Sequence, residues 1–258
     1  MLFACTSMDA GRGPFDEFTV ATAVLTRLPV GASAGEPGAV AAAGWAFPLV
    51  GAGIGAGCAL AYFVAGLCGL ADPVAAFIAL GAGLAITGAF HEDGLADTVD
   101  GFGGGRDRDQ KLAIMRDSRH GTFGILALVF SVGLRVAALA AIRDPIHVGL
   151  ALIAAHAASR GALPALMGLL ERARSDGLGA AAGRPTRAVA MAAAVIGGVL
   201  ALALLGPLPG IAALLSTVAA LTLAAMLARR QIGGYTGDVL GFFQQIGEIV
   251  MLLVAAAR

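Results

Sequence analysis

The chain has 258 residues, of which 58% are hydrophobic and only 13% are charged, and its mean hydropathy is +0.85. Soluble domains carry about 25% charged residues, so this composition excludes an ordinary water-soluble enzyme, a disordered chain and a coiled coil. The formal net charge is +0, so the chain as a whole has no attraction to nucleic acid. The composition indicates a polytopic membrane protein, and an aromatic content of 6% argues against a membrane β-barrel, which needs aromatic girdles.

Seven stretches are long and apolar enough to cross a bilayer, for which a helix needs about 20 residues. In chain order they cover about residues 40–67, 74–90, 122–142, 146–170, 188–205, 210–228 and 239–257. Residues 15–28 precede them with apolar side chains at helical spacing, which predicts an interfacial helix ended by Pro29. We predict an all-α integral membrane bundle of about seven transmembrane helices that forms one catalytic domain, 1–258, with residues 1–14 as a loose extension.

Basic residues alternate between the connections of this bundle. The N-terminal segment and the connections after the second, fourth and sixth spans hold 13 of the 17 Lys and Arg residues. Positive residues stay on the cytoplasmic side of a membrane, so the N-terminus and the polar motifs are expected on the cytoplasmic face of a bacterial inner membrane. Polar groups gathered at one face are typical of an enzyme with cytosolic substrates, whereas a transporter places them near the middle of the bilayer.

The strongest chemical motif follows the second span, where residues 91–101 read His-Glu-Asp-Gly-Leu-Ala-Asp-Thr-Val-Asp-Gly. On a helix, Asp93, Asp97 and Asp100 share one face because they are spaced by four and three residues. Stacked like charges destabilise a helix unless a cation neutralises them, and carboxylate oxygens suit Mg²⁺. We predict these three as catalytic metal ligands and His91 as the general base. The alternative is a solvated acidic helix end.

A second block lies a short distance further on, where residues 115–122 read Met-Arg-Asp-Ser-Arg-His-Gly-Thr. The guanidinium groups of Arg116 and Arg119 present planar forks of donors that match phosphate oxygens. Asp117 between them is predicted as a further metal ligand and catalytic residue. Together with the first motif, this block makes residues 91–121 the predicted cytoplasmic catalytic loop region. The alternative for the two arginines is that they only anchor this loop at the membrane surface.

Other polar residues fall at or inside the predicted spans. An arginine in lipid costs several kcal/mol, so Arg160 in the fourth span must face a polar cavity or a partner, which leaves a phosphate site and an ion pair open. Glu248 in the last span is the candidate partner of Arg135 in the third. Asp238 precedes the last span and is either a substrate-binding residue or a helix cap. Carboxylates for a divalent cation and arginines for phosphates together indicate phosphoryl transfer.

At these motifs the sequence resembles the cobalamin synthase family, the adenosylcobinamide-GDP ribazoletransferases. The resemblance rests on several blocks in the right order, at residues 26–29, 47–48, 90–101, 115–124, 159–160 and 233–241. It covers the chain from about Phe15 to the end. The main departure is Gln245, which stands where the family often has an acid.

The resemblance implies an activity and a set of roles. It implies that adenosylcobinamide-GDP is joined to α-ribazole or its 5′-phosphate with release of GMP, in a Mg²⁺-dependent reaction at the bacterial cytoplasmic membrane. The metal ligands would then be Asp93, Asp97 and Asp100, with Asp117 as a fourth. Phosphate binding would fall to Arg116 and Arg119, with Arg27, Arg160 and Asp238 as further substrate-binding candidates. An aspartate or His91 would take the proton of the attacking ribose hydroxyl.

Three other readings remain open at this point. A membrane phosphotransferase of the CDP-alcohol type shares an acidic face and Mg²⁺, but its Asp-Gly-x-x-Ala-Arg block is missing because Asp97 follows Ala96. A transporter would explain the charged residues inside the spans, but not the acids and arginines crowded into the connections. A non-catalytic subunit that associates with other corrinoid enzymes is the third reading. A homo-oligomer is compatible with each of them.

Overall fold

The computed structural model describes residues 13–31, 38–117 and 119–257. The described residues form helices and their connections and contain no β-strand. One isolated β-bridge joins Arg172 to Tyr235. The elements are α1 (Pro14–Leu25), α2 (Ala39–Ala42), the 3₁₀ turn η1 (Ala43–Ala46), α3 (Phe47–Leu67), α4 (Asp72–Thr87), α5 (Phe90–Gly104), α6 (Arg108–Ile114), α7 (Thr122–Ile142), α8 (Pro145–Leu169), α9 (Leu178–Ala181), α10 (Arg187–Leu205), α11 (Pro207–Ile232) and α12 (Gly237–Ala256). The predicted all-α class is confirmed. Most of the predicted extension, residues 1–12, lies outside the described residues.

Six helical segments of the described chain are long and apolar enough to cross a membrane. They are Ala39–Leu67, Thr122–Ile142, Pro145–Leu169, Arg187–Leu205, Pro207–Ile232 and Gly237–Ala256. The pair α4 and α5 passes the same test only together and is bent by 92°, so the total is seven if this pair counts as one broken span. The predicted multi-pass bundle of about seven spans is therefore confirmed.

The bend between α4 and α5 differs from the straight second span that hydropathy predicts. The helix stops at Thr87 because Gly88 and Ala89 both have left-handed backbone conformations, with φ of 68° and 58°. Only glycine adopts this conformation without strain, and a side chain on Gly88 would also collide with the side chain of Arg27. The chain therefore turns sharply and begins a separate polar helix, α5. The region predicted as a catalytic loop is thus largely the two helices α5 and α6.

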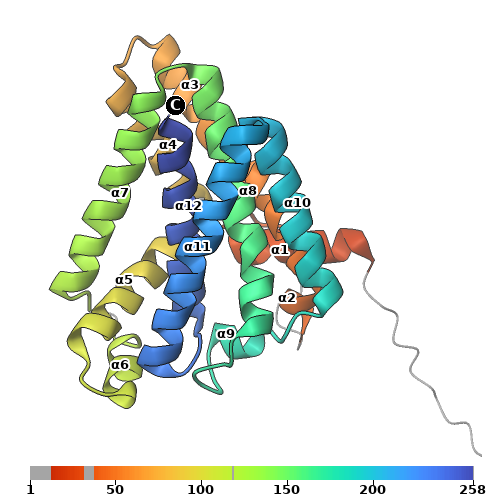
Figure 1. Ribbon diagram of the computed structural model, residues 1–258, viewed down its shortest axis with the longest axis vertical. Helices are drawn as coiled ribbons and strands as arrows, with labels where there is room; N and C mark the ends of the chain where they lie inside the picture. The colour runs from red at the N-terminus through yellow and green to blue at the C-terminus, as the bar shows by residue number, and fades with distance from the viewer. Residues whose placement is uncertain (1–12, 32–37, 118, 258) are drawn as a thin grey trace, which may run out of the picture.

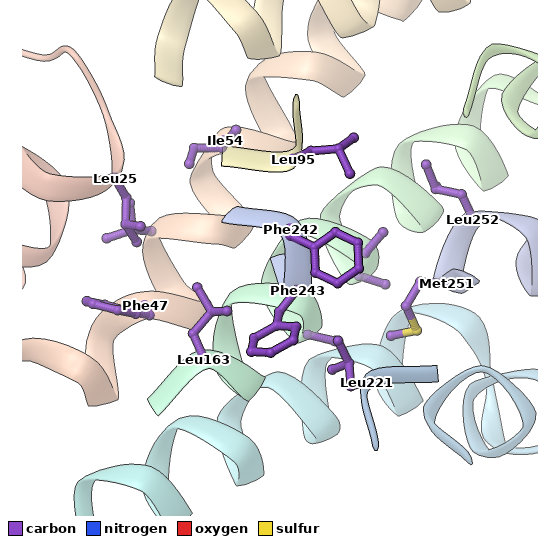
Figure 2. Packing of buried hydrophobic residues seen from close by; sticks show 14 of the residues in the cluster. Leu25, Phe47, Ile54, Leu95, Leu163, Leu221, Phe242, Phe243, Met251 and Leu252 are labelled. Carbon is purple, nitrogen blue, oxygen red and sulfur yellow. The ribbon is translucent and has the colours of Figure 1, made fainter. Parts of the chain in front are cut away.

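Helix α12 lies at the centre of the bundle and packs against α5, α7, α8 and α11. Figure 2 shows Phe242, Phe243 and Met251 of this helix among buried leucines, namely Leu95 of α5, Leu163 of α8 and Leu221 of α11. Large apolar side chains on the opposite, outward faces of the bundle are exposed, such as Phe130 of α7 and Val195 of α10. Exposed apolar surface of this kind is expected where helices face lipid.

Three arginine-bearing connections meet at one end of the bundle. The bridge between Arg172 and Tyr235 joins the segment after α8 to the segment after α11. Arg108 of α6 donates to the carbonyl oxygen of Ile232 at 3.0 Å and also to that of Ala173. Figure 1 shows α6 and α9 at the end opposite the C-terminus. The basic connections predicted to share one face therefore do so, whereas their location on the cytoplasmic side stays a prediction.

Candidate active site

Two predicted motifs meet on the polar side of α5. One ligand atom each from Asp93, Asp97 and His120 can be chosen so that all lie within 4.8 Å of one another. Nδ1 of His120 lies 3.8 Å from a carboxylate oxygen of Asp97. Asp93 and His120 are exposed and Asp97 is half-buried, so the group is open to solvent and to substrates. We call these three residues the acid cluster.

Close helix packing places α5 against the start of α12. Gly94 follows Asp93 on α5, and a Cβ atom there would lie only 2.6 Å from the carbonyl oxygen of Asp238. Because glycine carries no side chain, the two backbones can approach this closely. The Asp238 carboxylate accepts hydrogen bonds from Arg174 at 3.2 Å and from the Thr236 hydroxyl at 3.0 Å. The predicted substrate-binding residue Asp238 thus lies beside α5 and is held by an arginine.

Asp100 has a structural role that the sequence pattern did not reveal. Its carboxylate accepts the backbone N–H groups of Gly121 at 2.6 Å and Gly124 at 2.8 Å, at the start of α7. A carboxylate at a helix N-terminus satisfies free donors and interacts favourably with the helix dipole. Asp100 thereby fixes the residue next to His120 in position. Within the described residues it is not part of the acid cluster, and its role as a metal ligand stays a prediction.

The remaining acid of the second motif lies apart from the cluster. Arg119 donates to the Asp117 carboxylate through its backbone and side chain, with the shortest contact at 2.7 Å. These hydrogen bonds to Arg119 lower the pKa of Asp117 to about 2. The Arg119 side chain is 88% exposed, so this pair lies at the surface of the protein. The predicted metal-binding role of Asp117 and phosphate-binding role of Arg119 find no contact with the acid cluster among the described residues.

An arginine-rich cleft opens between α6 and the segment that follows α8. Its volume is about 770 Å³, and its lining includes Arg108, Arg116, Arg172, Arg174 and Asp176. Arg116 donates to both carboxylate oxygens of Asp176 at 2.7 Å. Nη1 of Arg174 is buried and has no hydrogen-bond partner among the described residues. Since four arginines exceed the acids that line it, this arginine cleft suits a phosphate-bearing ligand.

Two further cavities adjoin α5 on the side of α1. The polar cavity, of about 450 Å³, lies at the α4–α5 bend and is lined by Arg27 and Asp93 among others. The apolar cavity, of about 360 Å³, contains His91. His91 is 1% exposed and lies in this cavity rather than in the acid cluster. Its role as a general base stays a prediction. Arg27 and Asp93 line the same polar cavity, and the roles of these two residues also stay predictions.

Arg160 lies in a buried ionic network inside the bundle. The network joins Glu92, Arg135, His156, Arg160 and Glu248. Arg135 contacts Glu92 at 3.1 Å and Glu248 at 2.9 Å, which confirms the predicted pairing with Glu248. Arg160 is 1% exposed and contacts His156 at 2.8 Å and Glu248 at 3.7 Å. Of the two readings left open for Arg160, this geometry supports the ion pair.

Glu92, to which the sequence motifs assign no role, and Gln245 complete the network. Gln245 donates to Glu92 at 3.0 Å and accepts from the Ser131 hydroxyl at 2.9 Å. The departure from the family pattern at Gln245 therefore still provides a hydrogen-bonding side chain. Charge balance in the sequence could have indicated Glu92, because the two arginines inside spans need two acidic partners and Glu248 supplies only one. Glu92 is the second acid, and it ties α5 to α7.

The donor atoms of the acid cluster fit a hard divalent cation. Mg²⁺ is typically bound by one or two carboxylates, with water and substrate phosphates in the other positions. Asp93 and Asp97 offer such a pair in an open site. Imidazole nitrogen is a ligand for transition metals rather than for Mg²⁺, so His120 is better suited to hydrogen bonding at the edge of the cluster.

Comparison with known proteins decides the family. The family model for cobalamin-5-phosphate synthase matches residues 17–256. The chain belongs to this family. A cobalamin-5-phosphate synthase relative from Bradyrhizobium diazoefficiens, named adenosylcobinamide-GDP ribazoletransferase, is 52% identical over 248 residues, 95% of each chain. Relatives of the same name come from Mesorhizobium japonicum, 45% identical over 93% of each chain, and Azorhizobium caulinodans, 46% identical over 88% of this chain and 90% of its own. No solved structure matches the chain.

The match to the cobalamin-5-phosphate synthase family spans every part of the candidate site. Residues 17–256 contain the acid cluster, the arginine cleft, the two cavities beside α1 and the buried ionic network. The family resemblance seen in the motifs is therefore confirmed. Neither a CDP-alcohol phosphotransferase nor a transporter is needed to explain the polar residues.

Proposed function

We propose that this chain joins adenosylcobinamide-GDP to α-ribazole, or to α-ribazole 5′-phosphate, and releases GMP. One observation carries the proposal: Asp93, Asp97 and His120 converge beside a cavity that also contains Arg27, in a chain 52% identical to a ribazoletransferase. Phosphoryl transfer depends mainly on positioning and charge neutralisation, which is what convergent carboxylates and arginines provide.

The bond changes follow from the two substrates. A ribose hydroxyl of the ribazole attacks the phosphorus that is bonded to cobinamide, and a new O–P bond forms. The bond from this phosphorus to the bridging oxygen of the diphosphate breaks, and GMP leaves with that oxygen. A carboxylate of the acid cluster takes the hydroxyl proton, because a proton acceptor must lie within hydrogen-bond reach of the nucleophile. Asp93 is the residue of the acid cluster that lines the polar cavity, where a nucleoside would bind.

The charged residues divide the remaining work between them. We propose that Asp93 and Asp97 hold Mg²⁺, which when bound supplies positive charge against the diphosphate oxygens. Arg116 and Arg174 in the arginine cleft bind the guanosine diphosphate portion through their planar forks. Asp100 keeps the start of α7, and with it His120, beside Asp97.

The same arrangement supports a proposal for the membrane location. We place the protein in the bacterial cytoplasmic membrane with the acid cluster and the arginine cleft on the cytoplasmic face. Support comes from the arginines gathered at the α6 and α9 end of the bundle, because positive residues stay on the cytoplasmic side. Nucleotide-activated corrinoid and ribazole would then reach the site from the cytosol.

Product formation by the purified protein tests the proposal. The lipid-supplemented protein is given adenosylcobinamide-GDP and α-ribazole 5′-phosphate, with Mg²⁺ or with a chelator. We expect GMP and the joined corrinoid to appear in equal amounts, and only with Mg²⁺. A folded protein that forms neither product would contradict the proposed activity, and equal rates with the chelator would contradict the metal assignment.

A further inference from the structure

The apolar cavity and the polar cavity adjoin each other beside α5. Val24 of α1 and Phe90 of α5 line both of them. The apolar cavity, of about 360 Å³, is formed largely by side chains such as Leu25, Phe47 and Leu163. The polar cavity carries Arg27 and Asp93. A ligand that spans both would therefore have one apolar part and one charged or hydroxylated part, and it would end beside the acid cluster.

His91 is the polar group that the apolar cavity leaves unexplained. It is 1% exposed, and both of its ring nitrogens lack a hydrogen-bond partner among the described residues. A buried polar group without a partner costs free energy, and the great majority of such groups in proteins are paired. A neutral imidazole has one N–H donor and one acceptor nitrogen. A ligand that fills this cavity and carries a complementary nitrogen would remove the cost.

We propose that the apolar cavity binds the benzimidazole base of the ribazole, with His91 hydrogen-bonded to the free ring nitrogen of that base. This inference rests on the proposed function and identifies where the second substrate binds. The base is a flat apolar bicycle with one ring nitrogen that is not bonded to ribose and can accept a hydrogen bond. Its shape suits an apolar site with a single polar contact, which is typical of small-molecule sites of about 300–1,000 Å³.

The polar cavity completes the fit. With the base beside His91, the ribose lies at Phe90 and Asp93, and its hydroxyls face the acid cluster. Arg27 is exposed as a residue and forms no ion pair with another described residue. It is therefore free to bind the 5′-phosphate when the substrate carries one. His91 serves both forms of the substrate, whereas Arg27 serves only the phosphorylated form.

Filling the apolar cavity tests the inference. Ala23 on α1 lines this cavity, and Ala23→Phe would occupy the space of the base. Ala165 on α8 lines a separate cavity, so Ala165→Phe is a matched control with the same substitution. Binding of α-ribazole alone is measured by equilibrium dialysis on the detergent-solubilised full chain. We expect Ala23→Phe to weaken binding at least tenfold and Ala165→Phe to leave it unchanged. Equal binding by both variants would overturn the proposal.

Two further variants leave the apolar cavity close to its original volume and separate the polar contacts. His91→Leu removes the hydrogen bond, and we expect the KM for α-ribazole and for its 5′-phosphate to rise by a similar factor of up to about tenfold, as for one lost hydrogen bond. Arg27→Ala should raise the KM for the 5′-phosphate only. The KM for adenosylcobinamide-GDP should stay constant in both variants. A rise in all three KM values would overturn the assignment.

The outcomes also distinguish this inference from the proposed function and from a lipid ligand. A wild-type protein that binds α-ribazole but forms no product would contradict the proposed function and leave the binding site intact. If Ala23→Phe releases a co-purified lipid and still binds α-ribazole normally, the cavity holds an acyl chain and the inference is wrong. Thermal unfolding of each variant shows that a loss of binding occurs in a folded protein.

Discussion

Nδ1 of His120 lies 3.8 Å from Oδ1 of Asp97, and this contact joins two sequence motifs into one site. The contact depends on Asp100, whose carboxylate accepts the backbone N–H groups of Gly121 and Gly124 at the start of α7. The three aspartates of the first motif therefore lie in different surroundings. Asp93 and Asp97 face the open site, whereas Asp100 holds the second motif against the first.

Asp100→Asn should distinguish a role of Asp100 as the cap of α7 from a role as a metal ligand. The amide keeps one acceptor oxygen but turns an NH₂ group toward a backbone N–H, so we expect a loss of about 1–2 kcal/mol in the free energy of unfolding. The Mg²⁺ concentration for half-maximal activity should stay close to that of the wild type if Asp100 only caps α7. Chemical unfolding and a Mg²⁺ titration of the same preparation measure both effects. A large shift in the Mg²⁺ requirement at unchanged stability would instead make Asp100 a metal ligand.

The buried ionic network predicts strong coupling between Glu92 and Arg135. Removing one partner leaves an uncompensated charge, so Glu92→Gln and Arg135→Met should each cost about 3–5 kcal/mol of stability. The double variant should lose less than the sum of the two, because no unpaired charge remains between those two residues. A double-mutant cycle on the protein in lipid nanodiscs measures this coupling. Additive losses would show that the two side chains do not interact.

The arginine cleft predicts that replacing Arg174, which lines it, and replacing Arg119, which does not, have different effects on substrate binding. Arg174→Lys keeps the charge and loses the fork, so the KM for adenosylcobinamide-GDP should rise by about tenfold. Arg119→Lys should change it little, since Arg119 is 88% exposed and pairs with Asp117. Steady-state kinetics with the ribazole held saturating compares the two variants. A larger effect at Arg119 would move the phosphate site from the cleft to the surface loop.

Membrane orientation can be tested independently of activity. A reporter fused after Gly104, at the end of α5, should read cytoplasmic, and a reporter at the C-terminus should read external. The reason is that the arginine-bearing connections share one end of the bundle and the C-terminus lies at the other. Each fusion is compared with the same reporter on a protein of known orientation. The opposite pair of signals would place the acid cluster outside the cell.

Hydropathy was sufficient for most of the spans, because the apolar length of a helix is a local property of the sequence. The third predicted span coincides with α7, Thr122–Ile142. The sixth predicted span covers about residues 210–228, whereas α11 runs from Pro207 to Ile232. Proline suits the first turn of a helix, and the helix continues through two arginines beyond the apolar stretch. The additional residues at the two ends of α11 do not change the apolar stretch from which the span is predicted.

Hydropathy does not predict the bend before α5 or the contacts between motifs that are distant in the sequence. Ala89 adopts a left-handed conformation, which its residue type does not favour and which the surrounding fold imposes. The contact of Glu92 with Arg135 joins α5 to α7, and the contact of His120 with Asp97 joins the segment before α7 to α5. Spacing within one helix predicted that Asp93 and Asp97 share a face, but it carried no information on what lies opposite that face.

The proposed reaction depends on the acid cluster, and Asp97→Asn removes one of its two carboxylates. GMP and joined corrinoid are quantified over time in the wild type, in Asp97→Asn, and in Asp72→Asn as a matched control on α4. We expect the wild type and Asp72→Asn each to form GMP and joined corrinoid in equal amounts. For Asp97→Asn we expect a loss of at least about 100-fold in kcat, as for other lost charge-stabilising groups. Near-normal, Mg²⁺-dependent turnover by a folded Asp97→Asn protein would contradict the proposed role of the acid cluster.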